Sequence, residues 1–555
     1  MNLLLDAKKY LLEIYILTGR NKKYIYKIIL FGTFLGLFDI VTMFLLSKFI
    51  SLITNSNSLT INFFSKHLSF GILNFGAFLV LTYFIRMTLG VYLTYKVNIY
   101  SGNIEANLKS VLLYKYQLQK LSNEKDLSFG EKSTSINLWT SIFSKSLLAP
   151  LGKLISDLII SSIIMSYFVY HYPKIMFLFV SFSLITIFGY LKIISKISIS
   201  NSKKYQKSVT EASVIIDNAL SNYREVLSLN LAKYFSDKIK LKSVDANNAQ
   251  AISNTISSSP RFFIESILIL AVVTFLVIFS SVKDSNILSA LPNIAMLSIL
   301  LLRLTSLSSL LTATLTNLKY YRNMIISLLK IYQIPIRAMN KNSNSQQFMI
   351  LKLYNVSFSI SGKKIIKNLN FELKSGSNIA VLGKSGSGKS TLIDIFLGLL
   401  NPTSGKVMAI KKNLRNDNGI INLCTYVSES PFLLNTTIKD NIILGNLNKI
   451  CDIGDIISSL KIAGLDEFAN YQSLSLVVGN KGNKLSLGQR QRLCLARAIY
   501  ANKDILVLDE ATNAVDLKTD IAITKRLISL KNKTIITVTH RAEVARLFKQ
   551  KLRLD

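Results

Sequence analysis

A glycine-rich run at residues 383–391 has the composition and spacing of a phosphate-binding loop. It fits the pattern G-x-x-x-x-G-K-[ST], with an apolar run at 378–382 that predicts a strand before it and a segment at 392–400 that predicts a helix after it. In this context a chance Gly/Ser-rich turn is the weaker interpretation. The residues predicted to bind ATP in this loop are Gly383, Lys384, Ser385, Gly386, Ser387, Gly388, Lys389, Ser390 and Thr391.

The loop has a defined chemistry. Its glycines allow backbone N–H groups to close around phosphate oxygens, and the N-terminus of the following helix adds positive potential. Lys389 is expected to reach the β- and γ-phosphates of ATP, and the Ser390 hydroxyl to ligate Mg²⁺. ATP and Mg²⁺ are therefore the expected cofactors.

Two carboxylates end an apolar run at residues 505–510, downstream of this loop. Such a run predicts a buried parallel strand that delivers acids to its C-terminal end. Asp509 suits Mg²⁺, directly or through water, and Glu510 suits the general base that polarises the attacking water. Buried strands often end in Asp, so this run is not specific on its own. Its position downstream of the phosphate loop makes it an indication of a nucleotide site.

Residues 485–492, with the sequence LSLGQRQR, lie between these two motifs. Here the chain resembles the ABC ATPases, whose signature is L-S-G-G-Q, and the resemblance extends over residues 348–541. It implies ATP hydrolysis, and it implies that Ser486, Gly488 and Gln489 contact ATP held by another subunit. Small donors at the start of a helix suit such a contact with the γ-phosphate.

The resemblance also implies roles for residues farther along the chain. His540, in the sequence VTHR, matches the family's switch histidine, which contacts the γ-phosphate and Glu510. A lone histidine is more often structural, but this one follows the apolar strand expected at 534–538. Glu510 and His540 are thus the expected catalytic residues, and Asp516 matches the loop that crosses the dimer interface.

Several positions depart from the family pattern. Glu429 stands where the family usually has a Gln that contacts Mg²⁺ and the attacking water, so Glu429 is also expected to contact ATP. Leu487 replaces the first signature Gly, and Asn480 replaces a Glu of the interdomain loop. Ile360 stands where many members stack a Tyr on adenine, so either Phe358 substitutes for that Tyr or the stacking is weak. These changes leave open a nucleotide-gated regulator with little turnover.

The composition indicates that part of the chain lies in lipid. The 555 residues are 50% hydrophobic, with a mean hydropathy of +0.37, which is too apolar for an ordinary soluble enzyme. The net charge of +35 would suggest nucleic-acid binding in a soluble protein, but topology and compositional bias, or attraction to anionic lipid, account for it better. Six segments are predicted to span the bilayer, near residues 25–52, 70–97, 143–170, 174–195, 261–282 and 287–316.

The loops between these segments indicate the topology. Basic residues concentrate in the longer loops, so the positive-inside rule places both termini and the ATPase domain in the cytoplasm. The spans are expected to continue as helices into the cytosol, with short helices at 123–133 and 220–229 that lie on a partner domain. The N-terminal segment around Glu13 is expected to form an amphipathic entry helix.

The expected fold is a membrane all-α six-helix domain at residues 1–318 and an α/β P-loop ABC ATPase domain at 348–555. The segment 319–347 is the expected linker, with a helix at 320–334. One membrane domain with one ATPase domain cannot complete a nucleotide site. A homodimer is the simplest arrangement, and a paralogous half-transporter is the alternative.

Three arginines, Arg86, Arg261 and Arg303, lie in or at the edges of the spans. Charge within a span is costly and usually faces a cavity or the bundle interior. One hypothesis is that the three line a substrate cavity, because guanidinium binds phosphate through two parallel hydrogen bonds. The alternatives are snorkelling to the interface and structural ion pairs, such as Arg261 with Glu265.

At these positions the chain resembles the bacterial lipid-linked oligosaccharide flippases, through Arg86, residues 259–265 and residues 302–304 followed by Tyr320 and Tyr321. The resemblance implies that ATP hydrolysis moves a polyprenyl-pyrophosphate glycan for protein glycosylation from the inner to the outer leaflet. Residues 58–67 are then either an external interfacial helix or an ordinary loop. A peptide, protein or lipid exporter is the alternative, whereas a soluble ATPase bound to nucleic acid is excluded by the six spans.

Overall fold

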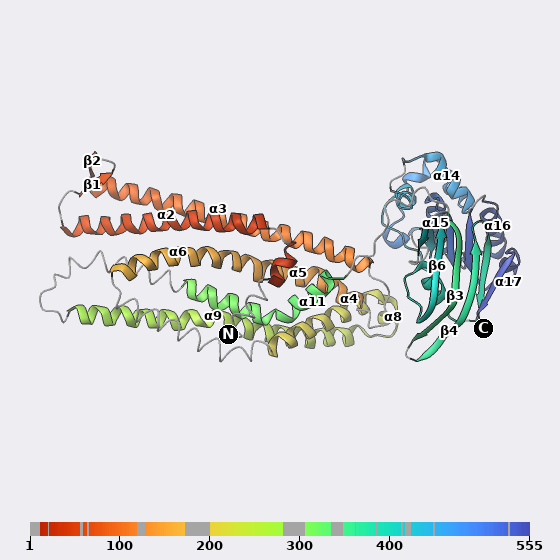
Figure 1. The fold of residues 1–555 in the computed structure, drawn as a ribbon, viewed down its shortest axis with the longest axis horizontal. Coiled ribbons are helices and arrows are strands. Elements are labelled where there is room, and N and C mark those ends of the chain that lie inside the picture. Colours follow the sequence, from red (N-terminus) through yellow and green to blue (C-terminus); the bar gives the residue numbers. More distant parts are fainter. Residues whose placement is uncertain are drawn as a thin grey trace. The chain divides into compact units, whose positions relative to one another are not determined.

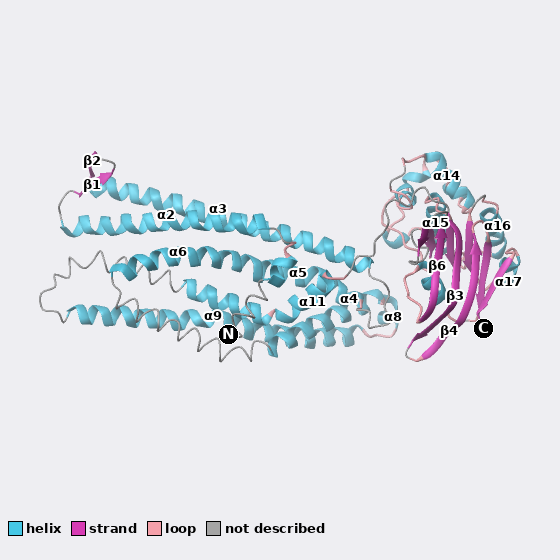
Figure 2. Cartoon of the chain, viewed as in Figure 1, coloured by secondary structure: helices cyan, strands magenta, loops and turns pink. Residues whose placement is uncertain are grey.

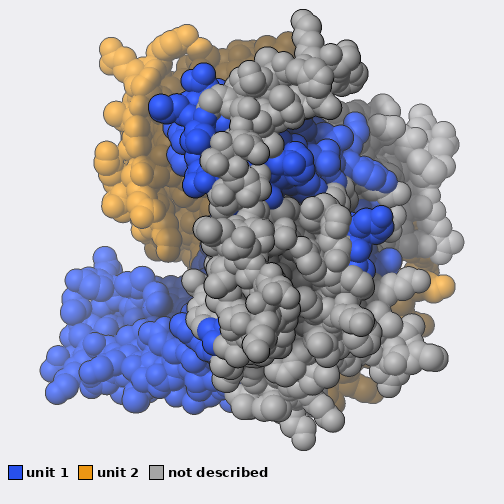
Figure 3. Space-filling model, turned by 90° about the vertical axis from the view of Figure 1, so that its left-hand side faces the viewer, with its two compact units in different colours: residues 1–119, 127–336 blue, residues 120–126, 337–555 orange. Residues whose placement is uncertain are grey.

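The structure is a computed structural model of the 555-residue chain. It describes residues 12–19, 22–55, 59–63, 66–70, 72–118, 128–171, 200–280, 306–334, 348–360, 362–384, 386–411, 414–416, 423–447, 450–530 and 533–554. The chain forms two compact units, drawn in different colours in Figure 3. Unit 1 contains residues 1–119 and 127–336, and unit 2 contains residues 120–126 and 337–555.

Unit 1 consists mainly of long helices that run beside one another (Figure 1). Their bounds are α2 Lys22–Asn55, α3 Ile72–Leu118, α6 Ala149–His171 and α9 Ala232–Ser280. Helix α2 packs against both α3 and α6. Within the described ranges, two helices are long and apolar enough to cross a membrane, with windows at Thr33–Ile50 and in Ile72–Leu118.

These helices cover most of the predicted spans. The predicted spans at 25–52, 70–97, 143–170 and 261–282 coincide with α2, α3, α6 with the turn before it, and the end of α9. The span at 174–195 lies outside the described residues, and only residues 306–316 of the sixth span are described, as helix. At 1.5 Å per residue, α3 and α9 are each about 70 Å long, against a hydrocarbon core of about 30 Å. The predicted helical extensions are therefore confirmed for both.

The two predicted short helices are present at the ends of these extensions. Helix α8 Tyr223–Ser228 lies inside the predicted segment 220–229. Helix α4 Phe129–Thr134 overlaps the end of the predicted segment 123–133, of which residues 123–127 lie outside the described ranges. A capping box between Ser128 and Glu131 starts α4. The helix then continues to α6 through η1 Ser135–Trp139, α5 Thr140–Ile142 and η2 Phe143–Leu148.

The segment between α2 and α3 is a β-hairpin, so the hypothesis of an interfacial helix at 58–67 is wrong. Strands β1 Leu59–Phe63 and β2 Lys66–Phe70 pair antiparallel, with Leu59 opposite Phe70. The apolar residues at 59, 61 and 63 follow the two-residue period of a strand rather than the 3.6-residue period of a helix.

The helix predicted at 320–334 is present as α11 Arg322–Tyr332, and it belongs to the core of unit 1. Its buried residues pack with Ile14 and Leu17 of the N-terminal helical segment. Arg322 Nη2 donates to Glu13 Oε1 at 3.0 Å, and Lys115 Nζ donates to the Ile334 carbonyl at 2.8 Å. Since both ends of α11 are held in this way, the boundary between the units falls after residue 336, inside the expected linker.

Unit 2 is built on two sheets (Figure 2), as predicted for an α/β ATPase domain. The parallel sheet has the strand order β11 Gln550–Leu554, β5 Asn378–Gly383, β10 Thr534–Val538, β9 Ile505–Asp509 and β8 Cys424–Val427. The antiparallel sheet has the order β4 Lys363–Lys374, β3 Phe348–Ile360, β6 Ser404–Lys411 and β7 Leu414–Asn416.

The helices of unit 2 bury the faces of these sheets. They are α12 Lys389–Leu397, α13 Ile438–Ile443, α14 Ile453–Ile462, α15 Leu487–Tyr500, α16 Leu517–Ile528 and α17 Ala542–Arg546, with single turns η4 Asp466–Phe468, η5 Ser473–Ser475 and η6 Asn480–Gly482. Strand β10 is buried along its whole length, and one core cluster joins α12 to β3 and β5. Full burial of each Leu, Ile or Phe contributes about 1.5–3 kcal/mol. This packing holds the C-terminal ends of the neighbouring parallel strands β5, β10 and β9 together at one end of the sheet.

Candidate nucleotide site

The phosphate loop joins the end of β5 to the start of α12. Gly386 and Gly388 have φ values of +80° and +94°, which favour glycine. A Cβ on Gly388 would lie 2.6 Å from Ile365 Cγ2, so the loop closes tightly against the antiparallel sheet. The Ser387 hydroxyl oxygen is buried and has no hydrogen-bond partner among the described residues. An orphaned hydroxyl in this loop fits a bound phosphate. Ser385 lies outside the described residues.

Lys389, at the first position of α12, directs its ammonium back into the loop. Its Nζ donates to the carbonyls of Gly383 and Lys384, each at 3.0 Å, and the side chain is buried. An ammonium has three donors, and these two carbonyls accept from two of them. The lysine is therefore held in the loop before a nucleotide arrives. Ser390, the next residue, is exposed.

The acidic residues Asp394, Asp509 and Glu510 are close enough for their charges to interact. Asp509, at the end of β9, accepts a hydrogen bond from the Tyr426 hydroxyl at 3.0 Å. Burial, with the nearby Glu510 carboxylate, raises the pKa of Asp509 above its usual value. Burial and Asp509 likewise raise the pKa of Asp394. A cation beside these carboxylates would relieve both penalties.

Asp394 was missed by the sequence reasoning, although its spacing contains a signal. It lies four residues after Ser390 in α12, so the two are on one face of the helix. Among the described residues, no group of three or more His, Cys, Asp and Glu side chains is arranged to hold a metal ion. Mg²⁺ in nucleotide sites is usually held by one or two protein groups together with the substrate phosphates.

Glu510 is held at both of its carboxylate oxygens. His540 Nε2 lies 2.9 Å from Oε1, and Asn513 Nδ2 donates to Oε2. Glu510 follows β9 and His540 follows β10, and the pairing of Asp509 with Val538 puts both residues at the same sheet edge. Glu510 also has a positive φ of 50°, a strained conformation that costs about 1–3 kcal/mol. The tertiary structure thus fixes the carboxylate in one orientation.

The signature segment starts α15. The Ser486 hydroxyl accepts from the Gln489 backbone N–H at 3.2 Å, and the Gln489 side chain accepts from the Ser486 N–H at 2.9 Å. A Cβ on Gly488 would lie 3.1 Å from the Ala514 carbonyl, so this glycine lies against the loop after Glu510. The signature residues thus start α15, whereas the phosphate loop leads into α12. These residues are Ser486, Gly488 and Gln489. Glu429 follows β8, with an exposed side chain.

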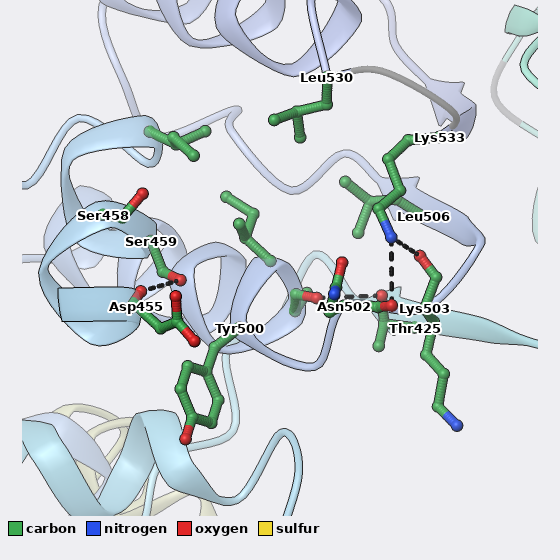
Figure 4. A pocket seen from close by; sticks show the side chains of 13 residues that line it. Thr425, Asp455, Ser458, Ser459, Tyr500, Asn502, Lys503, Leu506, Leu530 and Lys533 are labelled. Atoms are coloured by element: carbon green, nitrogen blue, oxygen red, sulfur yellow. Dashed lines mark hydrogen bonds between the residues drawn. The ribbon is translucent and has the colours of Figure 1, made fainter. Parts of the chain in front are cut away.

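A separate cavity of about 220 Å³ lies at the opposite edge of the parallel sheet (Figure 4). Of the residues that line it, Thr425 lies near the start of β8, and Lys503 and Lys533 lie just before β9 and β10. Lys533 Nζ donates to the carbonyls of Asn502 at 3.1 Å and Lys503 at 2.7 Å. Its ammonium therefore braces the turn before β9, and the cavity takes no part in the nucleotide site.

Of the three membrane arginines, the structure describes the side chain of Arg86 alone. Its Nε lies 2.5 Å from Asp39 Oδ1, and the Asp39 side chain is 2% exposed. The side chain of Arg261 and all of Arg303 lie outside the described residues, as does the Glu265 side chain. Asp39 is not among the residues predicted from the sequence, because the cavity hypothesis rested on the arginines of the spans. The signal was an isolated acid inside the apolar window Thr33–Ile50.

Comparisons with known proteins agree with this architecture. Residues 25–307 match the ABC transporter transmembrane region, and residues 366–513 match the ABC transporter family. The second match includes the phosphate loop, the signature segment and Glu510. A solved bacterial Atm1-family ABC exporter with ATP bound has the same fold, with a TM-score of 0.79 and 19% identity, over 96% of this chain and 93% of that one.

Curated relatives are similar over part of their length. The ATP-dependent lipid A-core flippase of Haemophilus influenzae (strain 86-028NP) is 31% identical over 366 residues, which are 63% of this chain and 61% of the flippase. The lactococcin-G-processing and transport ATP-binding protein of Lactococcus lactis is 34% identical over 234 residues, which are 41% of this chain and 33% of that protein. The chain thus matches about three fifths of the flippase's length. Because the transmembrane match alone covers more than half of its residues, this chain belongs to the ABC transporter family.

Proposed function

We propose that this chain is one half of an ATP-driven flippase that moves a lipid-linked oligosaccharide from the inner to the outer leaflet of a bacterial inner membrane. The observation that carries the ATPase part is the clamp on Glu510, whose carboxylate lies 2.9 Å from His540 at the sheet edge where the phosphate loop begins. A carboxylate fixed beside a phosphate loop is arranged to orient and deprotonate a water molecule.

The proposed hydrolysis assigns one task to each group. Lys389 holds the β- and γ-phosphates, and its position against the loop carbonyls pre-organises it. Ser390 and Asp509 would hold Mg²⁺, which would neutralise phosphate charge. Glu510 accepts the proton of the attacking water, and the donors His540 and Asn513 stabilise it as an anion that keeps its orientation.

A second chain completes each nucleotide site in this proposal. The signature residues Ser486, Gly488 and Gln489 start α15, whereas the phosphate loop precedes α12. The signature of one chain then covers the ATP bound by the other. A homodimer is the simplest arrangement, and a paralogous half-transporter is the alternative.

The cargo proposal is supported by the lipid A-core flippases among the relatives and by the charge in unit 1. Arg86 donates its Nε–H to Asp39, so the terminal nitrogens of the guanidinium are the donors that a pyrophosphate would take. In the proposed cavity, Arg86 acts together with Arg261 and Arg303. An anionic headgroup attached to a lipid tail is the substrate class that such a cavity favours.

The test uses purified protein in proteoliposomes that contain a fluorescent lipid-linked oligosaccharide. We expect ATP-dependent movement of the glycan to the other leaflet, and loss of both movement and ATP turnover in a Glu510→Gln variant. ATP turnover without glycan movement would contradict the cargo assignment and leave the ATPase assignment intact. Absence of turnover in the presence of bound ATP would favour the regulator with little turnover.

Peptide export is the second candidate, because the lactococcin G transport protein is 34% identical to this chain over 234 residues. Stimulation of ATP turnover separates the two. A flippase responds to polyprenyl-pyrophosphate glycans and not to peptides, whereas a peptide exporter shows the reverse.

A further inference from the structure

Gln491, in the first turns of α15, uses both ends of its side-chain amide to join two loops of the nucleotide site. Its Nε2 donates to the Glu429 carbonyl at 3.1 Å, and its Oε1 accepts from the Ala514 N–H at 3.0 Å. The side chain is 3% exposed. A carbonyl only accepts and a backbone N–H only donates, so these two partners require a neutral group that does both. The amide of glutamine meets this requirement.

The bond to residue 429 is made through the backbone. Glu429 replaces the glutamine usual in the family, but the atom that Gln491 contacts is the carbonyl oxygen, which every residue has. The side chain of residue 429 is exposed and stays available to the nucleotide. This hydrogen bond therefore depends on the position of the loop at 428–430 and not on the side chain of residue 429.

The bond to Ala514 holds the loop that follows the catalytic carboxylate. Arg541 Nη2 donates to the carbonyls of Asn513 and Val515, each at 2.8 Å, and the Asn513 side chain donates to Glu510. Arg541 directly follows His540, the other partner of Glu510. A shift of Ala514 would therefore move Asn513 and release one side of the Glu510 clamp.

These contacts form one continuous path from the Glu429 carbonyl through Gln491 and Ala514 to Asn513 and Glu510. We propose that Gln491 is a positioning residue that allows Glu510 to take its catalytic orientation only when the loops at 428–430 and 513–516 are both in place. The role rests on the proposed ATPase function and extends it, because it makes hydrolysis in each chain depend on the loop at residue 429.

Two substitutions separate the two bonds. Gln491→Met keeps the length and shape of the side chain and removes both hydrogen bonds. Gln491→Glu keeps an acceptor for the Ala514 N–H but places a carboxylate oxygen against the Glu429 carbonyl. The matched control is Gln472→Met, which makes the same chemical change at an exposed position of the same unit.

The first measurement is ATP turnover by the full chain in proteoliposomes. We expect Gln491→Met and Gln491→Glu to lower kcat about tenfold, the factor that about 1.4 kcal/mol of lost positioning produces, with a KM for ATP within about twofold of the parent. The control should match the parent in both. A parental kcat in Gln491→Glu, or a fall in ATP affinity that matches the fall in kcat, would overturn the proposed role.

The second measurement, hydrogen–deuterium exchange, needs no turnover. Gln491→Met should accelerate exchange in residues 511–516 and leave the strand β5 unchanged, while Gln491→Glu should retain protection at Ala514. Unaltered exchange in Gln491→Met would overturn the proposal. These outcomes are independent of the cargo, because a parent that hydrolyses ATP without moving glycan would contradict only the flippase assignment.

Discussion

The ion pair between Asp39 and Arg86 predicts an asymmetric loss of stability when either charge is removed. The Asp39 side chain is 2% exposed, whereas that of Arg86 is 33% exposed. Arg86→Gln removes the positive charge beside a carboxylate buried within α2, a loss that costs up to about 3–5 kcal/mol. Asp39→Asn leaves a cation that is partly exposed rather than buried, so we expect a smaller cost than for Arg86→Gln.

Both residues lie inside predicted membrane spans, Asp39 in residues 25–52 and Arg86 in residues 70–97. At 1.5 Å per residue, Asp39 is about 24 Å from the hairpin end of α2, and Arg86 is about 21 Å from the hairpin end of α3. Thr42 and Thr82, about one helical turn toward the hairpin, are buried as well. In Arg86→Gln the Asp39 carboxylate would therefore stay buried beside these helix faces and lose its cationic partner.

The assay compares the two single variants, the double variant and the parent by denaturation in mixed micelles. We expect Arg86→Gln to be the least stable and the double variant to recover most of the loss. Lys96→Gln is the matched control, because Lys96 is another cation of α3 and lies 5.2 Å from the Tyr92 ring centroid. Equal losses in the two single variants, or a double variant no better than Arg86→Gln, would refute the reasoning.

A charge-swapped chain separates stability from substrate binding. Asp39→Arg combined with Arg86→Asp restores a pair of opposite charges but moves the cation from α3 to α2. We expect recovered stability without recovered stimulation of ATP turnover by lipid-linked oligosaccharide. If the swap restores both, the pair is structural and Arg86 has no separate role in the proposed cavity.

Two further predictions concern unit 2. Burial raises the pKa values of Asp509 and Asp394, so each carboxyl group binds its proton more tightly in the folded chain than in the unfolded chain. The stability that results is present below the ordinary pKa of 3.8 and is lost as the pH rises through the raised pKa values. Asp509→Asn should therefore raise the thermal stability of the nucleotide-free chain at neutral pH and remove its gain with Mg·ATP, and a lower stability would contradict this. Gly388→Ala should weaken ATP binding at least about tenfold, measured by fluorescence titration, because the added Cβ lies 2.6 Å from Ile365 Cγ2. Its control, Gly362→Ala, has a similar φ of +82° but no atom within 4 Å of the added Cβ, and equal weakening in both would show that contact with Ile365 is not the cause.

Where chemistry depends on neighbouring positions in the chain, the sequence alone was sufficient. The phosphate loop, the strands before Glu510 and before His540, and the helix that starts after Ser486 all appear where the local patterns predict them. Parallel strands present their C-terminal ends at one edge, so the proximity of Glu510 and His540 follows from two separate local patterns. The hairpin at 59–70 is an exception, because residues 58–67 were expected to be an interfacial helix or a loop although a period of two is present in the sequence.

The partners of buried polar groups were decided by tertiary structure. Nothing in the sequence near Arg86 identifies Asp39 as its partner, since the two meet only where α2 packs against α3. Gln491 likewise stands beside the signature as one of several polar residues, and its role arises because folding brings Glu429 and Ala514 to the two ends of its amide. A buried donor, acceptor or charge is costly without a partner, and a partner distant in sequence is chosen by the packing of whole elements. Local spacing therefore determined which chemistry this chain carries, and the fold determined which groups hold that chemistry in position.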